Sequence, residues 1–129
     1  PAVANLDVPN ALVNSAKELG HPYHAGVVQC KDSFYGQHSP ERMPAGYELL
    51  NKWDAWLKAG ALASEMESSA VFIVSQILGM RAGCVLNVLW NQERAKNGME
   101  DIETHDMTAA IQVSIEAIRK LIREERDET

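Results

Sequence analysis

Residues 64–91 read SEMESSAVFIVSQILGMRAGCVLNVLWN, and this stretch decides the fold class. Apolar side chains lie nearly all round the segment from Glu67 to Leu78, which predicts a buried helix. Gly79 provides its stop signal. The apolar run from Arg81 to Trp90 then predicts a strand. A buried helix leading directly into an apolar strand is typical of the α/β class.

The flanking segments continue this alternation. Helical spacing of apolar residues predicts three further helices, at Val8 to Leu19, Leu49 to Ala59 and Thr104 to Arg126. Tyr23 to Val28 predicts a strand, whereas the glycines and prolines between Asp32 and Gly46 predict a loop. We therefore expect an α/β fold whose helices cover a mainly buried sheet.

Composition excludes several functional classes. The chain has 129 residues, 46% of them apolar, and a formal net charge of −6. That acidic balance argues against a nucleic-acid partner, and no apolar run approaches the roughly 20 residues that span a membrane. Cys30 and Cys84 lack metal-ligand spacing, so we expect no metal site and two buried thiols in a reducing compartment. Because residues 1–5 also lack the basic start of a signal peptide, we expect a cytoplasmic protein.

The first candidate site is the sequence Ser64-Glu65-Met66-Glu67-Ser68 at the start of the predicted buried helix. Carboxylates at a helix N-terminus stabilise the free backbone N–H groups, so a purely structural role is one interpretation. The other is a ribose site, because carboxylates accept hydrogen bonds from the 2′- and 3′-hydroxyls and methionine packs on an apolar sugar face.

The second candidate is the loop that contains Phe34, Gln37 and Arg42. A glutamine amide offers a donor and an acceptor together, which matches the N3–H and a carbonyl of uracil. Phe34 could stack on the base, and Arg42 could donate to a carbonyl oxygen. An ordinary loop anchored by aromatic residues is the alternative.

The third candidate follows the predicted strand, at Asn91-Gln92-Glu93-Arg94, where ligands gather in open α/β sheets. Dinucleotide-binding, Walker-type, nucleophile-elbow and zinc-protease motifs are absent from the sequence.

In combination, these motifs resemble the nucleoside phosphorylase family and, within it, the uridine phosphorylases. Glu65-Met66-Glu67-Ser68 resembles the ribose motif, and Phe34-Tyr35-Gly36-Gln37 with Arg42 resembles the uracil loop. The resemblance implies a three-layer fold with a central mixed sheet flanked by helices. Residues 1–129 would be the C-terminal part of that single domain.

The resemblance also implies a reaction, in which uridine and phosphate give uracil and ribose 1-phosphate without a cofactor. Glu67 would accept hydrogen bonds from the ribose with help from Met66 and Glu65, and Gln37 and Arg42 would hold uracil. Leu89 and Trp90 would form a wall beside the base, and Gln92 and Arg94 are possible accessory residues. The family's phosphate site belongs to its N-terminal half, so we expect no phosphate site here and no catalysis by this chain alone. Family members form homo-oligomers built from dimers, often hexamers.

The sequence departs from the family pattern in two places, and two other functions stay open. His38 to Glu41 separates Gln37 from Arg42, which are nearly adjacent in the family, and Gln92 occupies a position where an arginine is common. Purine phosphorylases and nucleosidases share the ribose motif, but they place an acid after the strand, where this chain has Asn91 and Gln92. A non-catalytic nucleoside-binding or assembly fragment is the alternative outside enzymes.

Overall fold

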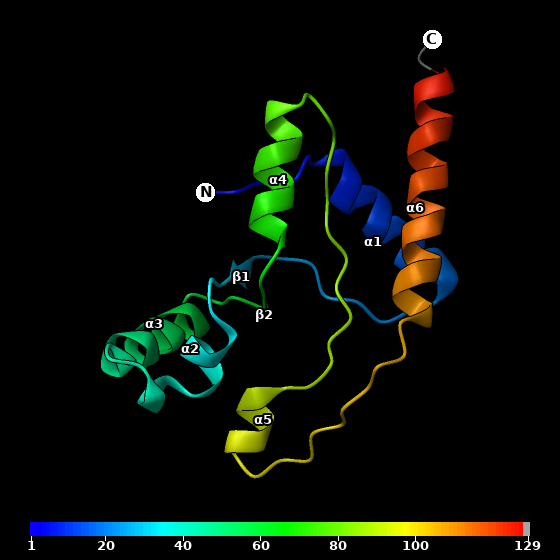
Figure 1. The fold of residues 1–129 in the computed structure, drawn as a ribbon. Coiled ribbons are helices and arrows are strands. Elements are labelled where there is room, and N and C mark those ends of the chain that lie inside the picture. The colour runs from blue at the N-terminus through cyan, green and yellow to red at the C-terminus, as the bar shows by residue number, and fades with distance from the viewer. Residues whose placement is uncertain (128–129) are drawn as a thin grey trace. The chain divides into compact units, whose positions relative to one another are not determined.

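The computed structural model describes residues 1–127, which fall into two compact units. The first unit contains residues 1–3 and 24–82, and the second contains residues 4–23 and those from Gly83 onward. The described residues contain both helices and two strands that pair in parallel, so the predicted α/β class is confirmed (Figure 1). Among the described residues no helix is both long and apolar enough to cross a membrane.

The first unit is built on a β–α–β crossover. Strand β1 (Val28–Cys30) pairs in parallel with β2 (Ala63–Glu65), and helix α3 (Gly46–Lys58) lies between them in sequence. Parallel neighbours need such a crossover, because a tight turn reverses chain direction. In this register Gln29 lies opposite Ser64 and Cys30 opposite Glu65. The register therefore brings the end of β1 beside the start of the predicted ribose motif.

Two sequence predictions in this unit need correction. The strand predicted at Tyr23 to Val28 begins only at Val28, where pairing with β2 begins. The predicted loop from Asp32 to Gly46 contains helix α2 (Phe34–His38) and the 3₁₀ helix η1 (Pro40–Arg42). Both helices are short and have local causes. Ser33 caps α2 by accepting a hydrogen bond from the Gly36 N–H at 3.0 Å, and Pro40 has the φ angle that suits the first residue of η1.

Helix α4 (Ser68–Ile77) confirms the predicted helix but not its burial. Its apolar side chains are largely exposed, up to 77% at Ile77, because the described residues provide no element that covers this face. Burial depends on a partner surface, whereas helix formation here follows from the sequence itself. Gly79 adopts a left-handed φ of 67°, which ends the helix as predicted.

The second unit is organised by α1 (Asp7–Leu19) packing on α6 (Thr108–Asp127). The residues buried on these two helices are small, which allows the helices to approach closely; they are Ala11, Ser15, Ala16, Val113 and Ala117. The apolar stripe predicted along α6 exists, but its four isoleucines at 111, 115, 118 and 122 are exposed. The contact with α1 uses a different face of α6.

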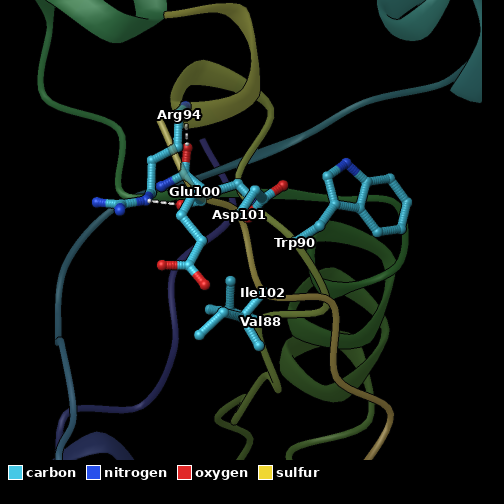
Figure 2. Close-up of a pocket in the computed structure, with 7 residues that line it drawn as sticks. Val88, Trp90, Arg94, Glu100, Asp101 and Ile102 are labelled. Atoms are coloured by element: carbon cyan, nitrogen blue, oxygen red, sulfur yellow. Dashed lines mark hydrogen bonds between the residues drawn. The ribbon is translucent and has the colours of Figure 1, made fainter. Parts of the chain in front are cut away.

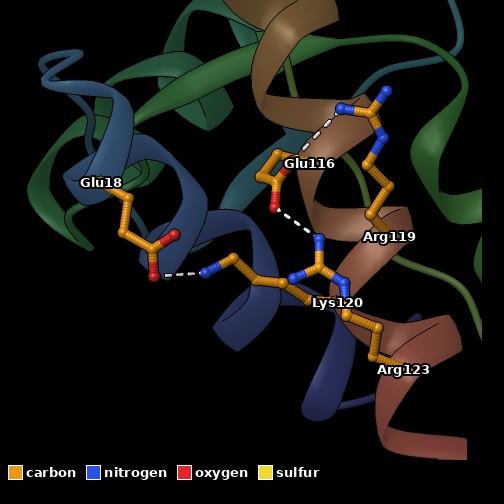
Figure 3. Close-up of polar contacts among 5 residues, drawn as sticks. All are labelled: Glu18, Glu116, Arg119, Lys120 and Arg123. Carbon is orange, nitrogen blue, oxygen red and sulfur yellow. Dashed lines mark hydrogen bonds and ion pairs between the residues drawn. The ribbon is translucent and has the colours of Figure 1, made fainter.

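Ion pairs join α1 to α6 and run along α6 (Figure 3). Lys120 of α6 donates to the carboxylate of Glu18 at the end of α1. Glu116 accepts from Arg119 at 3.5 Å and from Arg123 at 3.1 Å. The alternating charges of this helix thus form a salt-bridged surface, as expected of a solvated helix face.

Ser15 provides a test of the packing between α1 and α6. Its side chain is 0% exposed, and its hydroxyl has no hydrogen-bond partner among the described residues. Because an unpaired buried hydroxyl destabilises a fold, Ser15→Ala should raise the free energy of unfolding by about 1 kcal/mol. Urea denaturation measures this. Ser114→Ala is the matched control, since the Ser114 hydroxyl donates to the Ala110 carbonyl at 2.7 Å and its loss brings no gain. A lower stability of Ser15→Ala would mean that the hydroxyl is paired.

The predicted strand from Arg81 to Trp90 is wrong for the described residues. This segment forms no strand, because an extended segment needs a neighbouring strand to complete its ladder and no described strand pairs with it. One backbone hydrogen bond, from Thr104 N–H to the Leu89 carbonyl at 3.0 Å, holds its end. The prediction that both cysteines are buried is wrong, because Cys30 is half-buried and Cys84 is exposed. The polar stretch after the segment contains a short helix, α5 (Gln92–Lys96).

Candidate functional site

Glu65 is the N-terminal anchor of helix α4. Its Oε2 atom accepts hydrogen bonds from the backbone N–H groups of Glu67 and Ser68, each at 2.7 Å, and its Oε1 accepts from the Ser68 hydroxyl at 2.6 Å. Burial raises the pKa of the Glu65 carboxyl, but the hydrogen bonds from Ser68 and Glu67 outweigh it and hold the pKa below its ordinary value. Glu65 is therefore held as a carboxylate, with both oxygens engaged by the helix start.

Glu67 and Met66 have the opposite character. Glu67 occupies the N-cap position of α4 without capping it through its side chain, and both residues are exposed. The Glu67 carboxylate has no hydrogen-bond partner among the described residues. The structure thus separates the two acids of the motif: Glu65 positions the helix, and Glu67 is available to a ligand.

The predicted base loop forms a compact aromatic group. The Phe34 ring lies 4.2 Å from the His38 ring, centroid to centroid, and 5.4 Å from the Tyr35 ring in an edge-on arrangement. The Arg42 guanidinium lies 5.9 Å from the Tyr35 ring centroid, a cation–π distance. Phe34 and Arg42 are both exposed. The four residues between Gln37 and Arg42 therefore form a turn that returns Arg42 to the aromatic group.

Gln37 links this loop to the ribose motif. Its Oε1 lies 2.7 Å from the hydroxyl of Ser64, the residue directly before Glu65. Ser64 also contacts the Gln29 side chain at 3.0 Å and accepts from the Lys31 ammonium at 3.0 Å. Burial lowers the pKa of Lys31, against the attraction of Glu65 and Glu67, which favours the charged form. A polar network around Ser64 thus brings Gln37, one of the predicted base residues, next to the residue that directly precedes the predicted ribose motif.

Sequence reasoning missed two residues of that network, Gln29 and Lys31, and it gave no task to Ser64, the first residue of the candidate ribose stretch. Gln29 and Lys31 carry no motif of their own, and they meet Ser64 only because β1 and β2 pair in one particular register. The one available signal was position, since Ser64 directly precedes the paired acids.

The remaining candidates lie in the second unit, where Trp90 and Arg94 line a pocket of about 270 Å³ (Figure 2). Its lining combines apolar and polar side chains, from Val88, Trp90, Asn91, Arg94, Glu100, Asp101 and Ile102. Leu89 is half-buried beside this pocket but does not line it.

Several polar groups that line this pocket are hydrogen-bonded to one another. Arg94 Nε donates to the Glu100 carbonyl at 2.8 Å, and the Asn91 N–H donates to the Asp101 carboxylate at 2.8 Å. The Asn91 side chain caps α5 by accepting from the Arg94 N–H at 3.0 Å. Gln92 does not line the pocket, and its Oε1 is buried without a hydrogen-bond partner among the described residues. Arg94 therefore holds the loop in place.

Comparison with known proteins gives a consistent result. A family model described as the phosphorylase superfamily matches residues 1–123. The chain is 47% identical over 125 residues to a uridine phosphorylase of Treponema pallidum (strain Nichols), covering 97% of this chain and 48% of that protein. It is 32% identical over 129 residues to a uridine phosphorylase of Escherichia coli (strain K12), covering 95% and 49%.

A guanosine phosphorylase of Halorubrum lacusprofundi is 30% identical over 128 residues, covering 94% of this chain and 48% of that protein. The chain spans about half the length of the curated relatives that it matches.

Proposed function

Because this chain belongs to the phosphorylase superfamily, we propose that it is the base- and ribose-binding part of an enzyme that cleaves uridine with phosphate. The observation that carries the proposal is the contact between Gln37 and Ser64. Because of this contact, Gln37, a candidate residue for binding the base, lies beside the Glu65-Met66-Glu67 motif. The 47% identity to a protein named uridine phosphorylase supports the choice of base.

In this proposal Glu67 accepts hydrogen bonds from the ribose hydroxyls and Met66 packs against the sugar. Glu65 chiefly fixes the start of α4, and a direct contact between Glu65 and ribose stays a prediction. The exposed Glu67 carboxylate, which accepts no hydrogen bond from the described residues, suits a ligand that brings its own donors.

Gln37, Arg42 and Phe34 act on the base. A phosphate oxygen attacks C1′, the C1′–N1 bond breaks, and its electron pair leaves with uracil. Donors from Gln37 and Arg42 stabilise the negative charge that develops on the base oxygens, which accelerates the reaction because the charge grows towards the transition state. On the family resemblance we also propose that Leu89 and Trp90, which belong to the second unit, bind the base. Gln92 and Arg94 are proposed as accessory residues, although Arg94 Nε is already bonded to the Glu100 carbonyl.

Phosphate is the co-substrate, and no cofactor or metal is needed for this displacement. The relatives are about twice as long as this chain, and we place the phosphate site in a segment that corresponds to their N-terminal half. The exposed apolar faces of α4 and α6 would be covered by that segment or by other subunits. We further propose a cytoplasmic homo-oligomer that is built from dimers and has no nucleic-acid or membrane partner.

The test is base release by the protein expressed from its whole reading frame, with uridine, inosine, guanosine and adenosine as substrates. We expect uracil release from uridine that depends on phosphate, and no release by residues 1–129 alone. Release without phosphate would indicate a nucleosidase. Preferential release from guanosine or inosine would place the protein with the purine phosphorylases, and no release from any nucleoside would favour a non-catalytic fragment.

A further inference from the structure

Ser64 lies at the centre of a hydrogen-bond network that constrains the side-chain amide of Gln37. Its hydroxyl oxygen lies 2.7 Å from Gln37 Oε1, 3.0 Å from Gln29 Oε1 and 3.0 Å from Lys31 Nζ. A hydroxyl has one proton and two acceptor sites, and an ammonium group donates only. Lys31 therefore occupies one acceptor site, and the single proton of Ser64 serves only one of the two glutamines.

The distances indicate which glutamine accepts that proton. A separation of 2.7 Å is typical of O–H···O hydrogen bonds, whereas 3.0 Å is typical of N–H···O. The proton thus belongs on the bond to Gln37 Oε1. Gln29 completes the network when its amide nitrogen faces Ser64 and donates to the second acceptor site, because the O and N ends of an amide occupy nearly the same positions. In this arrangement the proton and both acceptor sites of the Ser64 hydroxyl are used.

We propose that Ser64, supported by Lys31 and Gln29, is a positioning residue that locks the orientation of the Gln37 amide and thereby selects a uracil-type base over a cytosine-type base. The proposal rests on the proposed function, since it assigns the base specificity of that same site. None of the three residues needs to touch the substrate.

The donor and acceptor patterns of the two bases explain the selection. Uracil presents an imide edge, in which the N3–H donor is flanked by two carbonyl acceptors. At N3 and C4 cytosine presents the reverse pattern, an unprotonated acceptor nitrogen beside an amino donor. A glutamine that turns freely can match either base by exchanging its O and N ends. A glutamine held with Oε1 towards Ser64 matches the pattern of uracil. With cytosine, the same orientation sets the amide donor of the glutamine against the amino donor of the base, so the fixed glutamine discriminates against cytosine.

The experiment measures binding of uridine and cytidine by calorimetry in phosphate-free buffer, so that no turnover occurs. It uses the protein from the whole reading frame and its Ser64→Ala, Ser64→Thr and Lys31→Met variants. Ser75→Ala, a serine loss on α4, is the matched control. We expect the wild-type protein to prefer uridine and Ser64→Ala to narrow the ratio of the two Kd values about tenfold, the effect of one hydrogen bond. Ser64→Thr keeps the hydroxyl and should retain the ratio, as should Ser75→Ala.

The possible results separate the two proposals. Loss of affinity for both nucleosides by the same factor, or an unchanged ratio in a folded Ser64→Ala variant, overturns the positioning role and leaves the proposed function standing. A wild-type protein that binds neither pyrimidine nucleoside overturns the proposed function and this inference with it. If Ser64→Ala does not fold, Lys31→Met provides the same comparison, because loss of the ammonium frees one acceptor site on Ser64 and lets the Gln37 amide turn.

Discussion

Replacing Glu67 with alanine is expected to lower kcat/KM for uridine phosphorolysis about a hundredfold to ten-thousandfold without changing the fold. A hydrogen bond to a charged acceptor contributes about 1.5–3 kcal/mol, and a ribose offers two hydroxyls to this carboxylate. Each 1.4 kcal/mol corresponds to a factor of ten in rate. The Glu67 side chain is exposed and has no hydrogen-bond partner among the described residues, so its loss should change the free energy of unfolding by less than about 0.5 kcal/mol.

The matched control for this prediction is the substrate itself. With 2′-deoxyuridine, which lacks one hydroxyl, Glu67→Ala should cost a smaller factor than with uridine, because one of the two hydrogen bonds is already absent. Steady-state kinetics on both substrates, with thermal denaturation alongside, tests this. If both substrates lost the same factor, Glu67 would not bind the 2′-hydroxyl, and a variant that fails to fold would make Glu67 a structural residue.

Local sequence predicted most of the helices because their causes are local. The helix predicted from Val8 to Leu19 matches α1, which begins at Asp7 and ends at the left-handed Gly20. The helix from Leu49 to Ala59 matches α3, apart from three residues at its start and one at its end. Apolar spacing and a glycine stop act within a few residues of each other, so no knowledge of the rest of the chain was needed.

Strand pairing and burial could not be predicted in the same way, because they depend on partners distant in sequence. The residues from Arg81 to Trp90 are apolar enough for a buried strand, yet they stay irregular because no described strand pairs with them. Ile77 was expected to be buried and is 77% exposed for the same kind of reason. An apolar pattern predicts that a segment prefers burial, but it does not provide the surface that buries it.

In the candidate site, too, the local motifs were predictable from the sequence and the contacts between distant segments were not. The Glu65-Met66-Glu67 motif was evident from its residues, and so was the loop containing Gln37. The sequence did not reveal that Ser64 joins them, because that contact depends on the β1–β2 register. The sequence also could not assign different roles to Glu65 and Glu67, because a helix cap and a sugar ligand are both consistent with the same residues. The structure assigns the cap to Glu65 and leaves the exposed carboxylate of Glu67 for a ligand.

Replacing Glu65 should therefore have a different signature from replacing Glu67. Glu65→Ala removes the acceptor of three hydrogen bonds and leaves the Ser68 side chain, only 4% exposed, without its partner. Loss of a helix cap costs about 1–2 kcal/mol, so the free energy of unfolding should fall by about that amount. Because α4 begins at the proposed ribose-binding residues, kcat/KM should fall as well. Urea denaturation and steady-state kinetics on the same variant measure both effects.

The dependence on pH distinguishes a capping carboxylate from a sugar ligand. The pKa of Glu65 is lowered in the folded protein, so its stabilisation is fully present above the pKa of the unfolded chain, about 4.3, and is lost as the pH falls through the folded value. The stability difference between the wild-type protein and Glu65→Gln should be constant from about pH 6 to pH 8 and should shrink below about pH 4.3. If Glu65→Gln unfolded like the wild type at neutral pH yet lost uridine binding, Glu65 would be a direct ribose ligand and its cap would contribute little. If stability and activity instead fall together in Glu65→Gln, the result supports separate roles for the two acids. Glu65 would hold the start of α4, and Glu67 would bind the sugar from that helix.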